Sequence, residues 1–294
     1  MAIKKVAVIG ATGMLGQPVT KQFLRAGFEV SVLARNVKKA QKIFGPGVRI
    51  IKGDLEDISS IKELINGQDA LYLSLSVEQN SRKTDFQPER DGLENLLEAA
   101  RSFPPMRIGY LSSLVQFYQG LNGFDWWVFQ IKQEAIAKIK SSGHPYSIFY
   151  PSTFMENFDK GAYVQGNAIL LAGRSVHPMF FISGDDYGRQ VANAFQQDKG
   201  NREYVIQGPE AYTADQAAKI YAENYTSARL STLKMPLGLL YFLGNFSKKL
   251  NYGARIIDAL NNYPEKFEAG GTWEELGRPE TTLADYIRKV NNEQ

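Results

Sequence analysis

The chain has 294 residues, of which 44% are hydrophobic and 22% are charged, and its formal net charge at pH 7 is +3. These values are ordinary for a soluble globular protein, and the small, interspersed charge does not indicate a nucleic-acid-binding patch. The sequence has no cysteine and only two histidines, His144 and His177. It therefore excludes disulfides and thiol chemistry, and we expect no metal site.

The chain enters a strand-like segment after two lysines, without the apolar stretch of a secretion signal. The most apolar late segment, residues 235–246, is too short to span a bilayer and contains Pro236. We therefore expect a cytoplasmic protein that acts on a small molecule, as a monomer or homodimer, without nucleic-acid or membrane partners.

The first strand-like segment, Val6–Ile9, runs into a Gly-x-x-Gly-x-x-Gly turn and a helix-like segment over residues 17–26. Gly10 lets the chain leave the strand sharply, Gly13 lets a pyrophosphate approach the backbone, and Gly16 lets the helix pack closely on the strand. The free N–H groups at the helix start attract phosphates. This context predicts a dinucleotide-binding turn. Its expected contact residues are Gly10, Thr12, Gly13, Met14, Leu15 and Gly16.

Strand-like and helix-like segments alternate through the first half of the chain. Five further strand-like segments follow the first, at residues 30–34, 48–51, 70–75, 108–111 and 146–150. Apolar residues at helical spacing predict helices over residues 91–100 and 129–139. This alternation predicts a doubly wound α/β domain over residues 1–158, with a parallel sheet covered by helices on both faces.

After Pro151 the alternation loosens, and capping sequences predict helices that begin after Ser183, Thr213 and Thr282. We expect residues 159–294 to form a smaller, mostly helical substrate lobe. It is interleaved with the first domain, because residues 183–208 are expected to add a helix and a strand to the sheet. Ligands of open α/β sheets bind beyond the carboxyl ends of the strands, so this lobe is expected to cover the cofactor cleft.

Arg35 ends the second strand, about twenty residues after the glycine turn, where NAD-specific proteins usually carry an acid. Its planar guanidinium can bind the 2′-phosphate of NADP. Three neighbours add donors or positive charge: Asn36, Lys38 and Lys39. No acidic residue lies between Glu29 and Asp54. We therefore predict that NADP(H) is preferred over NAD(H), the alternative being that Arg35 is a solvated surface residue.

Polar residues also follow the third, fourth and fifth strands, on the side where the cofactor is expected. Asp54 and Leu55 can meet the adenine edge, although an Asp here is equally typical of a turn or a helix cap. Further cofactor contacts are expected from the serine-containing strand ends: Ser74, Leu75, Ser76 and Ser112.

Taken in order, these motifs resemble the NmrA-like branch of the atypical short-chain dehydrogenases/reductases, nearly from end to end. The resemblance is carried by Gly10–Gly16, Gly53–Leu55, Ser142–Tyr146, Tyr150–Asn157, Ile182–Arg189 and Gly208–Ala211. It implies a Rossmann fold that binds NAD(P). It also implies cofactor contacts from the end of the sixth strand and the following loop: Tyr150, Pro151 and Phe154.

The catalytic comparison with that superfamily is mixed. Its usual pair is Tyr-x-x-x-Lys on one helix, in which the lysine holds the nicotinamide ribose and the tyrosine exchanges a proton with the substrate. The resemblance aligns Lys132 with this lysine, as both a catalytic and a cofactor-binding residue, but it places Val128 at the tyrosine position. Tyr118 is the candidate replacement donor, with Lys132 itself or a bound water as alternatives.

Six aromatic residues lie close in sequence to the expected site and can line an apolar pocket: Phe117, Phe124, Trp126, Trp127, Phe154 and Phe158. We therefore predict an NADPH-dependent oxidoreductase that reduces an aromatic, quinone-like or enone substrate. Val128 keeps a second hypothesis open, a non-catalytic NADP(H) sensor that acts through a protein partner. A sugar-nucleotide epimerase or isomerase ranks third, because such enzymes usually rely on the missing tyrosine.

Overall fold

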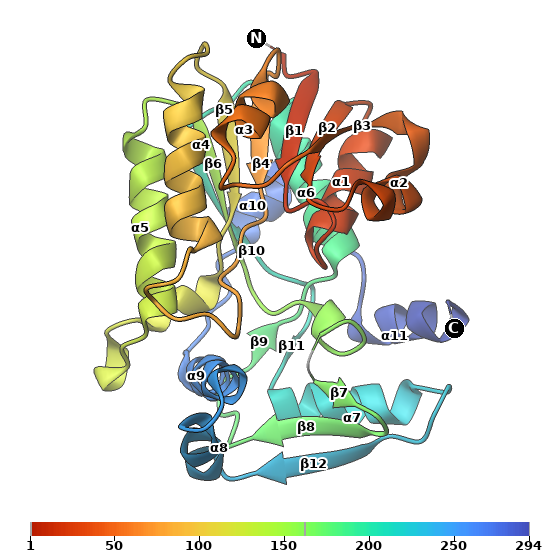
Figure 1. The fold of residues 1–294 in the computed structure, drawn as a ribbon. Helices are drawn as coiled ribbons and strands as arrows, with labels where there is room; N and C mark the ends of the chain where they lie inside the picture. Colours follow the sequence, from red (N-terminus) through yellow and green to blue (C-terminus); the bar gives the residue numbers. More distant parts are fainter. Residues whose placement is uncertain (1, 162, 294) are drawn as a thin grey trace.

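The computed structural model describes residues 2–161 and 163–293. Its centre is a seven-stranded parallel sheet in the order β10-β6-β5-β4-β1-β2-β3 (Figure 1). The strands are β1 (Lys5–Ile9), β2 (Glu29–Ala34), β3 (Val48–Lys52), β4 (Ala70–Leu73), β5 (Arg107–Leu111), β6 (Tyr146–Pro151) and β10 (Arg202–Ile206). This topology confirms the predicted doubly wound Rossmann fold.

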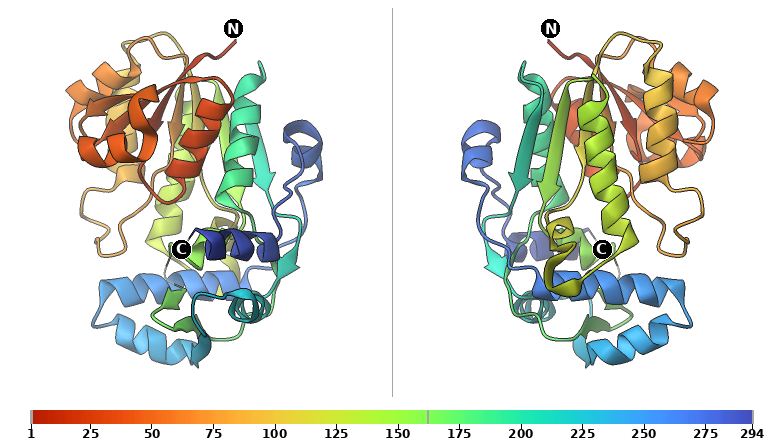
Figure 2. Two further views of the ribbon diagram at one scale, coloured as in Figure 1. Left: turned by 90° about the vertical axis from the view of Figure 1, so that its right-hand side faces the viewer. Right: turned by 90° about the vertical axis from the view of Figure 1, so that its left-hand side faces the viewer.

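Helices cover both faces of the sheet (Figures 1 and 2). One face carries α1 (Gly16–Arg25) and α6 (Gly184–Gln196), with α10 (Gly270–Leu276) packed on α6. The other carries α3 (Ile58–Ile65), α4 (Leu93–Ala100) and α5 (Trp127–Ser141), whereas α2 (Val37–Phe44) packs on β3 at the edge. Alternate residues of each strand enter the two cores, so the strands are apolar on both sides, as parallel sheets require.

The remaining elements form a lobe at the carboxyl edge of the sheet, below it in Figure 1. The lobe contains a three-stranded sheet and a two-stranded sheet, made of β7 (Val164–Gln165), β8 (Ala168–Ala172), β12 (Ser231–Met235), β9 (Met179–Phe180) and β11 (Ala211–Tyr212). Its helices are α7 (Ala214–Asn224), α8 (Leu237–Gly244), α9 (Lys248–Asn262) and α11 (Leu283–Asn292). Stacked rings of Phe158 and Tyr221, 4.6 Å apart, lie in its core.

The predicted caps form as local hydrogen bonds. Ser183 accepts from the backbone N–H of Asp186, and Thr213 and Thr282 each form a capping box. Within the described residues, no helix combines the length and apolarity that crossing a membrane needs. The same residues contain no group of three or more His, Cys, Asp or Glu side chains placed to hold a metal ion.

Candidate functional site

A cleft of about 680 Å³ lies between the carboxyl ends of the central strands and α9 of the lobe. It is lined by the glycine turn after β1, by the segments that follow β4, β5 and β6, and by residues of α5 and α9. The strands β1 and β4 are neighbours here, although the chain leaves them toward opposite sides of the sheet. Such a switch point is where doubly wound folds bind their ligands.

The glycine turn is packed so tightly that two of its glycines have no room for a side chain. Gly10 has a φ of +81°, and a Cβ on it would lie 2.1 Å from the carbonyl oxygen of Ser74. A Cβ on Gly16 would lie 2.0 Å from the carbonyl oxygen of Gly10. Gly13 instead lines the cleft. Leu15, at the start of α1, makes no capping hydrogen bond through its side chain, and it lines the cleft together with Met14.

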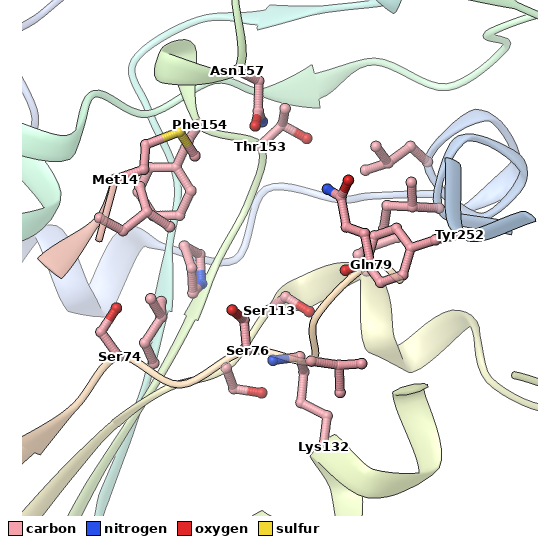
Figure 3. Close-up of a pocket in the computed structure, with 18 of the residues that line it drawn as sticks. Met14, Ser74, Ser76, Gln79, Ser113, Lys132, Thr153, Phe154, Asn157 and Tyr252 are labelled. Carbon is pink, nitrogen blue, oxygen red and sulfur yellow. The ribbon is translucent and has the colours of Figure 1, made fainter. Parts of the chain in front are cut away.

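Of the seventeen residues predicted to bind the cofactor, ten line this cleft. The lining residues among them are Gly13, Met14, Leu15, Ser74, Leu75, Ser76, Ser112, Lys132, Pro151 and Phe154. Figure 3 shows Met14 and Phe154 at one end and Gln79 and Tyr252 at the other. The predicted residues that do not line it are Gly10, Thr12, Gly16, Arg35, Asp54, Leu55 and Tyr150.

Several of these outlying residues have clear local roles. The carboxylate of Asp54 accepts from the backbone N–H of Glu56 at 2.9 Å, which is a turn contact. Leu55 is buried, and Thr12 accepts from the side chain of Gln17 at 3.1 Å through its carbonyl oxygen.

Two further outlying residues differ sharply in their surroundings. The hydroxyl of Tyr150 donates to Glu203 at 2.6 Å. Arg35 is exposed and forms no hydrogen bond or ion pair with any other described residue.

Lys132 extends from α5 into the cleft and is held by a buried carboxylate. Its Nζ lies 2.5 Å from Oε1 of Glu89, in the π-helical turn Pro88–Gly92 that precedes α4. The Tyr110 hydroxyl donates to the same oxygen at 2.7 Å. Burial and the Glu89 charge together hold the pKa of Tyr110 well above its usual value, so its hydroxyl stays protonated. Glu89 is completely buried, and its Oε2 has no partner among the described residues.

Glu89 could not be recognised as a site residue from the sequence, because it carries no spacing motif and precedes the predicted helix at 91–100. The one available signal was indirect: a lysine placed beside an apolar cleft needs an acid nearby. No local pattern indicates which acid supplies it.

The candidate catalytic tyrosine does not reach the cleft. Tyr118 is 4% exposed, its ring lies 5.0 Å from that of Phe124, and it belongs to an apolar cluster with Val128 and Phe129. Val128 is itself 3% exposed, so neither a hydroxyl nor an open position occurs at the usual tyrosine site. Ser113 does line the cleft, and its buried hydroxyl has no partner among the described residues. Figure 3 shows Lys132 directed toward the side where Ser76 and Ser113 lie.

The far wall of the cleft comes mainly from α9, through Tyr252, Ile256 and Leu260. Burial raises the pKa of Tyr252 to about 12, so its hydroxyl remains a donor at neutral pH. Glu265 adds a carboxylate that accepts from the Ser152 hydroxyl at 2.8 Å. Of the six aromatic residues expected to form this wall, Phe154 lines the cleft and the others do not. The apolar surface therefore comes largely from the lobe.

Comparisons with known proteins agree with this architecture. A family model described as the NmrA-like family matches residues 2–287. The photosystem II assembly factor Ycf39 of Trieres chinensis is 24% identical over 257 residues, which cover 86% of this chain and 79% of that protein.

Two solved structures share the fold at low sequence identity. One is the Escherichia coli NADPH-dependent quinone oxidoreductase QOR2 complexed with NADPH. Its TM-score is 0.74 and its identity 19%, and the match covers 97% of this chain and 99% of that one. The other is the Citrobacter sp. triphenylmethane reductase complexed with NADP(H), with a TM-score of 0.73, 18% identity and the same coverages, 97% and 99%.

Proposed function

Because the chain belongs to the NmrA-like family, we propose that it is an NADP(H)-dependent reductase. One observation carries the proposal: the glycine turn and the ammonium group of Lys132 line the same cleft, at the switch point of the sheet. The two similar solved structures, described as complexes with NADPH and NADP(H), support the choice of cofactor.

The residues of this chain fit a dinucleotide. Gly13 presents backbone without a side chain to the cleft, and the uncapped start of α1 supplies N–H groups and a positive dipole end for the pyrophosphate. Arg35 is available for a 2′-phosphate because no carboxylate of the described residues competes for it. Ser74 and Ser112 add hydroxyl groups along the strand ends.

When bound, NADPH would supply a hydride to an electrophilic acceptor and become NADP⁺, and the reduced acceptor would take its proton from water. The residues of the chain provide binding and polarisation. Lys132, kept in place by Glu89, donates hydrogen bonds to the ribose hydroxyls. The unpaired hydroxyl of Ser113 is the side chain we assign to the oxygen of the acceptor. Tyr118 has no part in this scheme, because its side chain is buried and does not line the cleft.

The apolar wall of α9 and the assigned role of Ser113 favour a flat, apolar acceptor with a carbonyl oxygen, such as a quinone or an enone. Oxidation of NADPH, followed at its absorbance band with a panel of these acceptors, tests the proposal. We expect Lys132→Met to lose most of the turnover. Lys138→Met, which changes a lysine on the same helix that pairs with Glu94, is the matched control and is expected to retain it. Tight binding of NADPH without oxidation by any acceptor would contradict the proposal.

A second candidate function is a non-catalytic NADP(H) sensor. Val128 favours it, because its buried side chain offers no proton where the superfamily places its tyrosine. The likeness to a protein described as an assembly factor points the same way. A sensor is expected to bind NADP⁺ and NADPH with different affinities and to retain a protein partner in only one of the two states. Equal affinities, with no partner recovered in either state, would argue against it.

A further inference from the structure

The outer face of the lobe, made of β12, α8 and the turn into α9, carries large apolar side chains that the described chain leaves uncovered. The exposed fractions are 57% for Leu233, 46% for Leu239, 59% for Phe242 and 79% for Phe246. Leu239 and Phe242 lie about one turn apart on α8, and the ring of Phe242 lies 5.6 Å from that of Phe246 in the turn that follows. We call Leu239, Phe242 and Phe246 the α8 stripe.

The opposite side of α8 is also apolar. Leu240 packs there in a small core with Ala172 of β8 and Ala254 of α9. A helix that is apolar all round is normally enclosed on every side. The described chain covers only the inner side of α8, so the α8 stripe requires a cover from outside the chain.

Two carboxylates near the α8 stripe have partners, since Asp258 accepts from the Tyr241 hydroxyl of α8 and Asp215 pairs with Lys234. The exposed charges that directly follow the stripe in sequence are basic. Residues 224–257 contain five basic residues and none of the chain's 31 acidic residues. Lys248 and Lys249 are exposed and follow Phe246 almost directly at the start of α9, whereas Lys234 is paired with Asp215. An exposed apolar stripe beside exposed lysines is complementary to a lipid bilayer whose interior is apolar and whose headgroups are anionic.

We propose that the α8 stripe docks the protein on an anionic bilayer surface, with Leu239 and Phe242 inserted and Lys248 at the headgroups. A second copy fits poorly, because a symmetric contact through this face would bring like charges together. Aromatic residues such as Phe242 are also enriched in protein interfaces, but lysines are depleted there, so the exposed Lys248 and Lys249 favour an anionic bilayer over a protein partner. Lys249 also lines the cleft, so docking would bring the cleft close to the membrane surface. The proposal does not depend on cofactor binding.

Co-sedimentation of the full chain with vesicles tests this docking. We expect binding to vesicles of phosphatidylcholine mixed with phosphatidylglycerol, weaker binding to phosphatidylcholine alone, and a decline as salt is raised. The double variant Leu239→Ser/Phe242→Ser is expected to bind more than about tenfold more weakly. Lys248→Glu is expected to cost about fivefold or more on anionic vesicles and little on neutral ones.

Two control variants separate the stripe from general surface effects. Leu121→Ser changes another leucine that is 44% exposed, and Lys38→Glu changes an exposed lysine in α2, so both are expected to bind like the parent protein. Circular dichroism and thermal melting establish that each variant is folded. Failure to bind anionic vesicles would overturn the proposal, as would binding that the stripe variants leave unchanged. A soluble dimer that Leu239→Ser/Phe242→Ser dissociates, without vesicle binding, would assign the stripe to self-association instead.

Discussion

The Arg35→Ala variant tests the cofactor preference most directly. Arg35 is exposed and unpaired within the described chain, so its removal breaks no contact of the free protein. A charge-assisted hydrogen-bond pair of this kind contributes about 1.5–3 kcal/mol. Because Arg35 is exposed, solvent screening places its contribution to NADPH binding near the lower end of this range, at about 2 kcal/mol. This loss corresponds to a roughly thirtyfold rise in the Kd for NADPH. NADH lacks the 2′-phosphate, so its Kd is expected to change by less than about twofold.

Titration calorimetry with both cofactors measures this change. Arg49→Ala is the matched control, because Arg49 lies on the adjacent strand β3, near its amino-terminal end, and pairs only weakly with Glu63 at 3.8 Å. If the ratio of NADPH to NADH affinity does not fall in Arg35→Ala, Arg35 is not the 2′-phosphate ligand. If the ratio of NADPH to NADH affinity falls equally in Arg49→Ala, the loss of positive charge in general, rather than a contact from Arg35, explains the change.

Three further predictions concern residues packed in the interior of the protein. Gly16→Ala is expected to lower both thermal stability and NADPH affinity, because the new Cβ would lie 2.0 Å from a backbone oxygen. Gly47→Ala, at a position with open space, is expected to change neither. An equal loss in both variants would refute the steric explanation. Lys132→Met is expected to lower the free energy of unfolding in urea by about 3 kcal/mol, because it leaves the buried Glu89 carboxylate without its cation; wild-type stability would contradict the pairing. Burial raises the pKa of Glu156 from 4.5 to about 7, so the folded state retains a proton that the unfolded chain releases. The free energy of unfolding is therefore expected to fall by about 3 kcal/mol between about pH 4 and pH 8, and Glu156→Gln is expected to remove this slope; its persistence would exclude Glu156 as the cause.

The parts of the fold that the sequence predicts well are those whose signals are local. The strand Val6–Ile9 and the helix that follows the glycine turn appear close to their expected bounds, because apolar runs and the turn chemistry act over a few residues. Capping residues such as Thr213 and Thr282 also mark helix starts correctly. The sheets of the lobe were not predicted, because strands as short as Val164–Gln165 bury too few side chains to show a period.

Side-chain neighbourhoods were harder to predict than backbone elements. Tyr118 follows a strand that ends at the cleft, yet its ring enters an apolar cluster, because the short 3₁₀ turn over Leu114–Tyr118 carries it away. Tyr252 and Ile256 line the cleft from α9, more than a hundred residues after the strands they face. Such contacts depend on how the lobe packs, which no periodicity in one segment reveals.

The pair formed by Lys132 and Glu89 allows structural and catalytic roles to be separated. A buried ion pair is generally no more stable than an apolar pair of similar size, although breaking it from one side is costly. The double variant Lys132→Met/Glu89→Leu removes both charges. Among the described residues, the Tyr110 hydroxyl then loses its acceptor. We therefore expect the double variant to recover much of the stability lost in Lys132→Met. If turnover or NADPH affinity remains lost while stability returns, the ammonium group serves the cofactor and its substrate; if both return together, the pair is structural.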